Sequence, residues 1–237
     1  MSGNDKAHHE GDPEDDEFEF RSYSSPACMM HEFDHISNSQ PEEPPTTNPV
    51  HHWEEIRLWR KAKRVTLIER RLAISSRERS AHSQAITAAL LKVLPIEAGT
   101  LIGFYWPFRG EYDPRGVIRL LHAQKVRLAL PVVVRKAEPL IFREWRPGIT
   151  MASGLWNIPV PAVGEPVAPS LLLVPVVGFD RQNYRLGYGG GYYDRTLAAP
   201  GRPRTVGVGF EHSQIATIYP QAHDIPMDQV ITERAIT

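Results

Sequence analysis

Apolar and polar positions follow two different periods along residues 53–237, and each period predicts a different kind of element. At the start of this stretch, apolar residues recur at helical spacing among many bases, at Ile56, Trp59, Leu67, Ile68, Leu72 and Ile74. This spacing predicts an amphipathic helix over 54–74. Ser75 and Glu78 stand at the spacing of a capping box, which predicts a second helix running to about Val93.

Short apolar runs after this helical region predict strands. The candidates are 100–106, 126–134, 138–145, 170–177, 204–210 and 228–232. The run 170–177, SLLLVPVV, is apolar throughout, which is typical of a strand covered on both faces. Asp113 and Pro114 resemble the N-cap and first residue of a helix through about Gln124, and YYDRTLA (192–198) is another helix candidate. The alternation predicts an α/β fold, a mostly parallel sheet flanked by helices with an antiparallel addition.

Residues 1–50 have a different composition from the rest of the chain. They carry twelve acidic and two basic residues, a net charge of −10, whereas residues 51–237 carry +9. Few aliphatic residues are available there to offset the entropy of ordering, so we expect an acidic disordered extension followed by a single α/β domain over 51–237. Four histidines in the extension could bind a metal loosely, although composition favours a solvated tail: His8, His9, His31 and His35.

Composition narrows the class of protein. No apolar run reaches the roughly 18–20 residues of a membrane helix, and the N-terminus has no basic start followed by an apolar stretch. The single cysteine, Cys28, excludes an intramolecular disulfide framework and a cysteine zinc site. We therefore expect a cytoplasmic enzyme or binding protein. The basic body favours an anionic partner, although a solvated surface also explains such a charge.

The stretch RLGYGGGYYDR, residues 185–195, is the strongest candidate for a functional loop. It does not match a Walker loop, because no Gly-Lys pair occurs in the chain. It does not match the dinucleotide fingerprint either, because Tyr192 stands where the third glycine is required after Gly187 and Gly189.

Physical chemistry still favours an anion site here. The glycines at 189–191 can bring bare backbone N–H groups close to a ligand, and a helix that begins near Tyr192 adds partial positive charge. Arg185 and Arg195 add full charges, and the stretch follows the buried strand 170–177, where open α/β sheets bind ligands. Asp194 beside bound phosphate would suit Mg²⁺. The alternative is a glycine-rich turn with an ordinary surface pair of Arg185 and Asp194.

The longer stretch VPVVGFDRQNYRLGYGGGYYDRTLA resembles the signature of the 5-formyltetrahydrofolate cyclo-ligase family. FYWPFRGEYD, ALPVVV, WNIPVP and HDIPMDQVIT resemble other segments of that family in the same order, so the resemblance covers roughly residues 55–235. It implies an enzyme that uses ATP and Mg²⁺ to convert 5-formyltetrahydrofolate to 5,10-methenyltetrahydrofolate, ADP and phosphate. ATP would phosphorylate the formyl oxygen and N10 would attack that carbon, so no protein nucleophile is required.

The resemblance also implies roles for individual residues. Arg185 and Tyr193 would act in catalysis, and Asp194 and Asp224 would bind the metal. The residues implied to bind ATP are Arg60, Lys61, Arg64, Arg185, Gly187, Gly189, Gly190, Gly191 and Tyr193. Those implied to bind the folate are Trp106, Glu111, Trp156, Tyr188 and Tyr192.

One feature departs from the family's pattern. The family usually has a lysine four residues before an arginine on its first helix, whereas this chain has Arg60 and Arg64 at that spacing. Either Arg60 replaces the lysine or the register shifts to Lys61; a planar guanidinium and a point charge are not equivalent phosphate ligands. The departure leaves open a second function, a non-catalytic folate or nucleotide sensor. The sequence argues against a nucleic-acid partner, since the basic residues are not interleaved with aromatic residues as in RNA-binding modules. The sequence does not indicate the oligomeric state.

Overall fold

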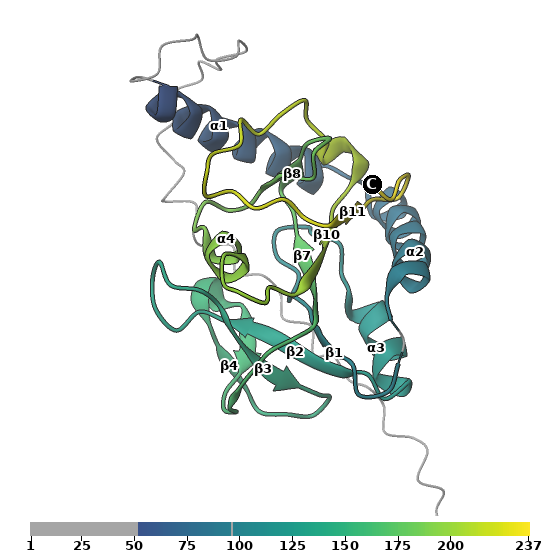
Figure 1. Ribbon diagram of the computed structural model, residues 1–237. Helices are drawn as coiled ribbons and strands as arrows, with labels where there is room; N and C mark the ends of the chain where they lie inside the picture. Colours follow the sequence, from purple (N-terminus) through teal and green to yellow (C-terminus); the bar gives the residue numbers. More distant parts are fainter. Residues whose placement is uncertain (1–51, 96) are drawn as a thin grey trace, which may run out of the picture.

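The computed structural model describes residues 52–95 and 97–237, so the predicted extension over 1–50 and its histidines lie outside the described residues (Figure 1). The helices are α1 (His52–Leu72), α2 (Ser76–Val93), α3 (Arg115–Ala123) and α4 (Tyr192–Leu197), with 3-10 turns η2 (Leu155–Asn157) and η3 (Glu211–Ser213). The strands are β1 (Leu101–Gly103), β2 (Arg127–Val132), β3 (Ile141–Trp145), β4 (Met151–Ser153), β5 (Pro159–Pro161), β6 (Pro166–Val167), β7 (Leu171–Pro175), β8 (Gly178–Phe179), β9 (Arg185–Leu186), β10 (Arg204–Val208) and β11 (Gln229–Ile231). Among the described helices, none is long and apolar enough to cross a bilayer.

The helix boundaries follow the sequence signals closely. Ser75 caps α2, because its hydroxyl oxygen accepts a hydrogen bond from the backbone N–H of Glu78. Helix α3 begins one residue later than predicted, at Arg115. Asp113 nevertheless stabilises the start of this helix, since its Oδ1 accepts a 3.0 Å hydrogen bond from the backbone N–H of Arg115.

Seven strands form the main sheet, in the order β11-β10-β7-β1-β2-β3-β6. The strands from β11 to β2 are parallel, whereas β3 and β6 pair antiparallel at one edge, which confirms the predicted architecture. The strand expected over 100–106 is shorter than predicted. After Gly103, the N–H of Phe104 still donates to the carbonyl of Ala129, and the chain then leaves the sheet as the loop that carries Trp106 and Glu111.

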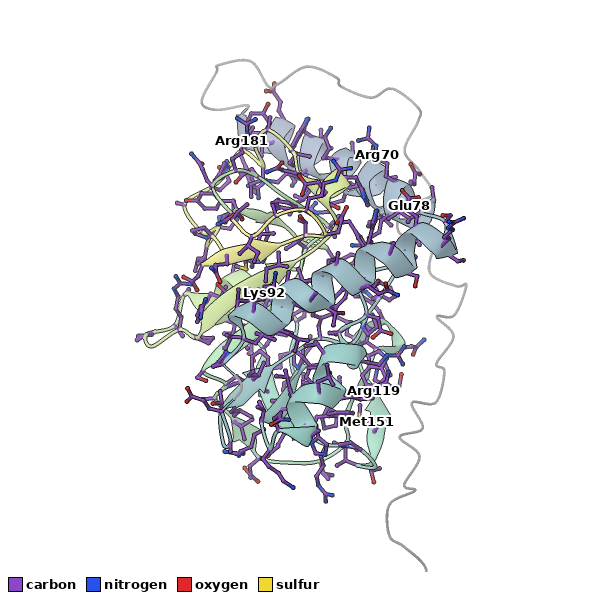
Figure 2. The ribbon with its side chains drawn as sticks, turned by 90° about the vertical axis from the view of Figure 1, so that its right-hand side faces the viewer. Arg70, Glu78, Lys92, Arg119, Met151 and Arg181 are labelled. Carbon is purple, nitrogen blue, oxygen red and sulfur yellow. The ribbon has the colours of Figure 1, made fainter. Side chains whose placement is uncertain are left out.

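Both faces of the sheet are covered, as the all-apolar run 170–177 predicts. Leu171 and Leu173 pack in a core with residues of α2 and α3, whereas Leu172 and Val174 pack in a second core with Leu197 of α4. Successive residues of a strand point to opposite faces, so a strand between two cores must be apolar at every position. Figure 1 shows α2 and α3 on one side of the sheet and α4 on the other, and Figure 2 shows α2 crossing its face from Glu78 to Lys92.

The parallel arrangement determines where a ligand site can form. The carboxyl ends of the parallel strands β1, β2 and β7 lie at the same end of the sheet, and the loops that follow β1 and β7 converge there. The carboxyl ends of the strands are the usual place for ligands in open α/β sheets. Helix α1 lies close to these carboxyl ends, since Arg71 donates to the carbonyl of Val176 and Arg60 to the carbonyl of Ile218.

Candidate active site

A cleft of about 660 Å³ opens at the carboxyl ends of the parallel strands. Its walls come from α1, the loop after β1, the turn η2, the glycine loop 187–191 and the segment 222–225. Sites for small molecules and cofactors usually measure about 300–1,000 Å³, so the cleft has the size of a ligand site.

The cleft brings together nearly all of the residues that the sequence singled out. Those that line it are Arg60, Arg64, Trp106, Glu111, Trp156, Arg185, Gly187, Tyr188, Gly189, Gly190, Gly191, Tyr192, Tyr193, Asp194 and Asp224. Lys61 does not line it and is exposed. The residues of α1 that line the cleft recur at spacings of three or four and so share one face of the helix: Trp53, Arg57, Arg60 and Arg64. Lys61 lies at the border of that face.

At positions 189–191, the glycine loop has a conformation that side chains would disrupt. Gly191 caps α4 in the left-handed region, with φ +64°, and α4 begins at Tyr192 as predicted. A Cβ on Gly190 would lie only 2.7 Å from the ring of Tyr192. A Cβ on Gly187, in contrast, would meet no atom within 4 Å, because this residue faces the open cleft. The loop therefore exposes backbone to a ligand where a side chain would block it.

Arg64 is the cation best placed to meet an anion in the cleft. Its Nε donates a 2.7 Å hydrogen bond to the carbonyl of Gly187, and its guanidinium carbon lies 3.4 Å from where a Cβ on Gly189 would be. Its two terminal nitrogens make no hydrogen bond within the described part of the chain. Burial and the neighbouring charge of Arg60 lower the pKa of Arg64 to about 10, so it remains a cation at neutral pH.

Arg60, in contrast, uses its hydrogen-bond donors on other groups of the protein. Its Nε donates to the carbonyl of Ile218 at 2.9 Å, and its Nη2 donates to the carbonyl of Tyr219 at 2.8 Å. Both terminal nitrogens also contact the carboxylate of Asp224, the closer at 2.5 Å. Burial raises the pKa of Asp224, but hydrogen bonds from Arg60 and from the N–H of Gln221 hold this pKa below its usual value. Arg60 thus orders the segment that carries Asp224.

Asp194 and Asp224 lie at the same end of the cleft, although 30 positions separate them in the chain. The Oδ1 of Asp194 accepts a 3.2 Å hydrogen bond from the N–H of Ile225, the residue after Asp224. The same oxygen lies 2.9 Å from Nη2 of Arg185, whose Nη1 donates to the carbonyl of Ile225. Oδ2 of Asp194 accepts no hydrogen bond from any described residue. This carboxylate oxygen is therefore available to a ligand.

The opposite end of the cleft is built around Glu111. Its side chain is buried, with Oε2 accepting a 2.9 Å hydrogen bond from the N–H of Phe108 and Oε1 accepting one of 2.9 Å from the hydroxyl of Tyr188. Burial raises the pKa of Glu111 to about 7, against the opposing effects of Arg71 and of both hydrogen bonds. Such a carboxyl group can orient a ligand that offers paired N–H donors.

Three aromatic rings enclose this end of the cleft. Phe108 stacks on Trp156 with centroids 5.9 Å apart and planes inclined by 12°, and Tyr188 packs against both rings at 5.6 Å. Trp156 and the following Asn157 both have positive φ, 56° and 58°. Non-glycine residues rarely adopt that conformation, and its cost is commonly found where a ligand is held. Trp106 is also half-buried in the cleft wall.

Phe108, which lines the cleft, and Arg71, which donates to Tyr188 in its wall, were not predicted from the sequence. Phe108 stands three residues before Glu111 in FYWPFRGEYD, so the motif contained the signal, but the Phe108–Trp156 stack joins segments nearly 50 residues apart. Arg71 is one base among many on a basic helix, and nothing in its local sequence marks it as buried.

Comparison with known proteins identifies relatives over most of the described chain. The model of the 5-formyltetrahydrofolate cyclo-ligase family matches residues 56–233. The chain is 29% identical to the 5-formyltetrahydrofolate cyclo-ligase of Escherichia coli strain K12 over 172 residues, 69% of this chain and 94% of that protein. It is also 29% identical to the enzyme of that name from Mycolicibacterium smegmatis, over 72% of this chain and 92% of that one.

A solved structure supports the same relationship. The NMR structure of the Aquifex aeolicus 5,10-methenyltetrahydrofolate synthetase has a TM-score of 0.64 and 29% identity, covering 75% of this chain and 91% of that chain. The Mycoplasma pneumoniae 5,10-methenyltetrahydrofolate synthetase, at 24% identity, shares the fold with a TM-score of 0.61 over 73% of this chain and 98% of its own.

The buried Glu111 carboxyl predicts an unusual dependence of stability on pH. Its pKa of about 7 lies above the ordinary value of 4.5, so the folded state binds this proton more tightly than the unfolded state between those pH values. The contribution of Glu111 to stability is thus highest below about pH 4.5 and is lost as pH rises through 7. Relative to Glu111→Gln, the wild-type free energy of unfolding should fall by about 2–3 kcal/mol between pH 5 and pH 8 in urea titrations. A difference that does not change with pH would contradict this.

Proposed function

The chain belongs to the 5-formyltetrahydrofolate cyclo-ligase family, and we propose that its cleft binds ATP and 5-formyltetrahydrofolate side by side for direct phosphoryl transfer. The protein has the activity of that family, the ATP-dependent closure of 5-formyltetrahydrofolate to 5,10-methenyltetrahydrofolate. The observation that carries the proposal is the position of the glycine loop, which lies between the Arg64 and Asp194 end of the cleft and the Glu111 end.

The end near Arg64 is suited to the phosphates of ATP. Its guanidinium lies beside the exposed backbone of the loop, so side-chain and backbone donors converge on one place. Arg185 adds positive charge, and its guanidinium lies 5.7 Å from the ring centre of Tyr193. Burial raises the pKa of Tyr193, so its hydroxyl stays protonated and can donate to a phosphoryl oxygen. Arg60 acts indirectly, by holding the segment around Asp224.

The residues at this end also fit Mg²⁺. The described residues contain no cluster of three or more His, Cys, Asp or Glu that could enclose a metal, and Mg²⁺ bound with nucleotides typically takes one or two carboxylates together with phosphate oxygens. Asp194 and Asp224 would supply two such carboxylates. Oδ2 of Asp194 accepts no hydrogen bond from a described residue, whereas both oxygens of Asp224 also accept from Arg60. When bound, the ion would offset the negative charge that accumulates on the transferred phosphoryl group.

The Glu111 end is suited to the folate. A carboxylate buried beneath aromatic rings can accept paired hydrogen bonds from the amide-like edge of a pterin, while Trp156, Phe108 and Tyr188 supply surfaces for flat rings. Trp106 and Tyr192 also line the cleft. With the pterin held here, the formyl group on N5 is directed past the glycine loop toward the phosphates.

The chemistry then needs positioning more than protein nucleophiles. The formyl oxygen attacks the γ-phosphorus and ADP leaves; N10 next attacks the activated carbon, and the phosphate departs with the former formyl oxygen. The residues of this chain would hold the two substrates in line and neutralise charge, which can supply most of such a rate enhancement. Loss of one N10 proton to solvent balances the closure.

The direct test is product formation. With 5-formyltetrahydrofolate, ATP and Mg²⁺, the purified protein should generate the absorbance of the methenyl product together with equal amounts of ADP and phosphate. Omission of either substrate is the control. If folded protein forms no product over a range of divalent ions while still binding the folate, the chain would be a sensor and not a catalyst.

Two basic residues of α1, Arg64 and Lys61, give a matched pair of variants that test the proposed phosphate end of the cleft. Arg64→Met should raise KM for ATP about ten- to hundredfold, because it removes charged hydrogen bonds worth about 1.5–3 kcal/mol. Lys61→Met removes the same charge from an exposed position and should change KM for ATP by no more than about twofold. Steady-state kinetics with each substrate varied in turn will separate them. Equal effects of the two variants would mean that overall charge, and not the position of Arg64, attracts ATP.

A further inference from the structure

Arg71 is a buried cation near the end of α1 that does not line the cleft. Only 2% of its surface is exposed. Its guanidinium donates to three separate segments: Nε to the carbonyl of Arg109 at 3.0 Å, Nη1 to the carbonyl of Val176 at 3.3 Å and Nη2 to the hydroxyl of Tyr188 at 2.7 Å. No described carboxylate lies within salt-bridge distance of it. An arginine buried in this way costs free energy, which its contacts must offset.

The contact with Tyr188 determines which way that hydroxyl points. A tyrosine hydroxyl has one proton to donate, and here its oxygen already accepts from Nη2 of Arg71. Its proton is then directed to the nearest acceptor, Oε1 of Glu111 at 2.9 Å, in preference to the carbonyl of Phe108 at 3.5 Å. A chain of two hydrogen bonds thus connects the buried cation to the carboxyl group in the cleft.

We propose that Arg71 is a positioning residue for folate binding: through the hydroxyl of Tyr188 it holds Glu111 as an oriented, ionised acceptor. The folate part of this inference rests on the function proposed above, whereas the link between Arg71 and Glu111 does not. The arrangement answers a physical difficulty, because a buried carboxyl group tends to take up a proton and would then offer a donor to a ligand that itself donates.

The other groups that face Glu111 do not supply this positive charge. Tyr105 from the loop after β1 and Tyr193 from α4 are neutral hydroxyls, and burial together with Glu111 raises the pKa of each. The remaining contact is the backbone N–H of Phe108. Arg71 is the cation that lowers the pKa of Glu111 against burial.

The link can be measured without any ligand. In protein labelled with ¹³C at the glutamate side-chain carboxyls, the signal of Glu111 is the one missing from Glu111→Gln, and its titration midpoint can be followed. The midpoint should rise by about one unit or more in Arg71→Met, which removes the nearby charge. Tyr188→Phe keeps Arg71 and breaks the chain, so it should also raise the midpoint, and the two effects should be less than additive in the double variant.

Arg79 provides the matched control. It donates to the carbonyls of Gly110 and Arg71, so it supports the same loop, but it does not contact Tyr188 or Glu111. Arg79→Met should leave the midpoint of Glu111 unchanged, although it lowers stability. If Arg79→Met raises the midpoint as much as Arg71→Met, or if neither Arg71→Met nor Tyr188→Phe raises it, Arg71 only braces the loop and the inference is wrong.

Binding of 5-formyltetrahydrofolate, followed by calorimetry from pH 6 to pH 9, then tests the consequence. Arg71→Met should bind the folate about tenfold more weakly near pH 7, with a deficit that narrows toward pH 9 as Glu111 ionises in both proteins. A deficit that is the same at every pH would refute the role in binding. If Arg71→Met and Tyr188→Phe raise the midpoint of Glu111 but the wild-type protein binds no folate, the proposed substrate is refuted. The link from Arg71 to Glu111 then still holds.

Discussion

The hydrogen bond from Nε of Arg64 to the carbonyl of Gly187 ties α1 to the glycine loop, and both ends of the cleft depend on where that loop lies. On one side the loop runs into α4, which places Asp194 against Arg185 and beside the segment of Asp224. Within the loop, Tyr188 extends to the other end and contacts Glu111. A shift of the loop would therefore move the proposed phosphate and pterin sites together, and catalysis by positioning is sensitive to such shifts.

Burial has opposite consequences for the charges at the two ends. At the Arg64 end, desolvation lowers the pKa of both Arg64 and Arg185, and nearby carboxylates offset part of that effect. Arg64, with a pKa of about 10, remains a cation at neutral pH. At the Glu111 end, desolvation brings the carboxyl pKa to about 7, so its charge at neutral pH depends on the hydrogen bonds and on Arg71. Stability is thus lowered at the proposed ligand sites, in keeping with the positive φ of Trp156 in the same wall.

The fold could largely be predicted from the sequence because its signals are local. The apolar run 170–177, the cap at Ser75 and the helical spacing of α1 each depend on neighbours in the chain, and the structure confirms them. The strand over 100–106 was predicted too long, since hydrophobicity alone does not distinguish residues paired in a sheet from the buried loop after Gly103. The glycine loop could be proposed as a site from its composition, whereas Asp224 and Glu111 became candidates only through the family resemblance.

Pairings between distant segments could not be predicted. Arg60 and Arg64 look equivalent in the sequence, yet the fold commits one to Asp224 and leaves the terminal nitrogens of the other facing the cleft. Arg71 differs from its basic neighbours only because Tyr188 and two carbonyls from other segments surround it. Such distinctions arise from tertiary contacts and leave no local pattern.

Direct transfer between two substrates in one cleft is tested best by following the formyl oxygen. With 5-formyltetrahydrofolate labelled with ¹⁸O in the formyl group, a single turnover with ATP should place the label in the released inorganic phosphate, which mass spectrometry detects. Phosphate without the label, formed together with the methenyl product, would show that the formyl oxygen never bonds to the transferred phosphorus and would contradict the mechanism.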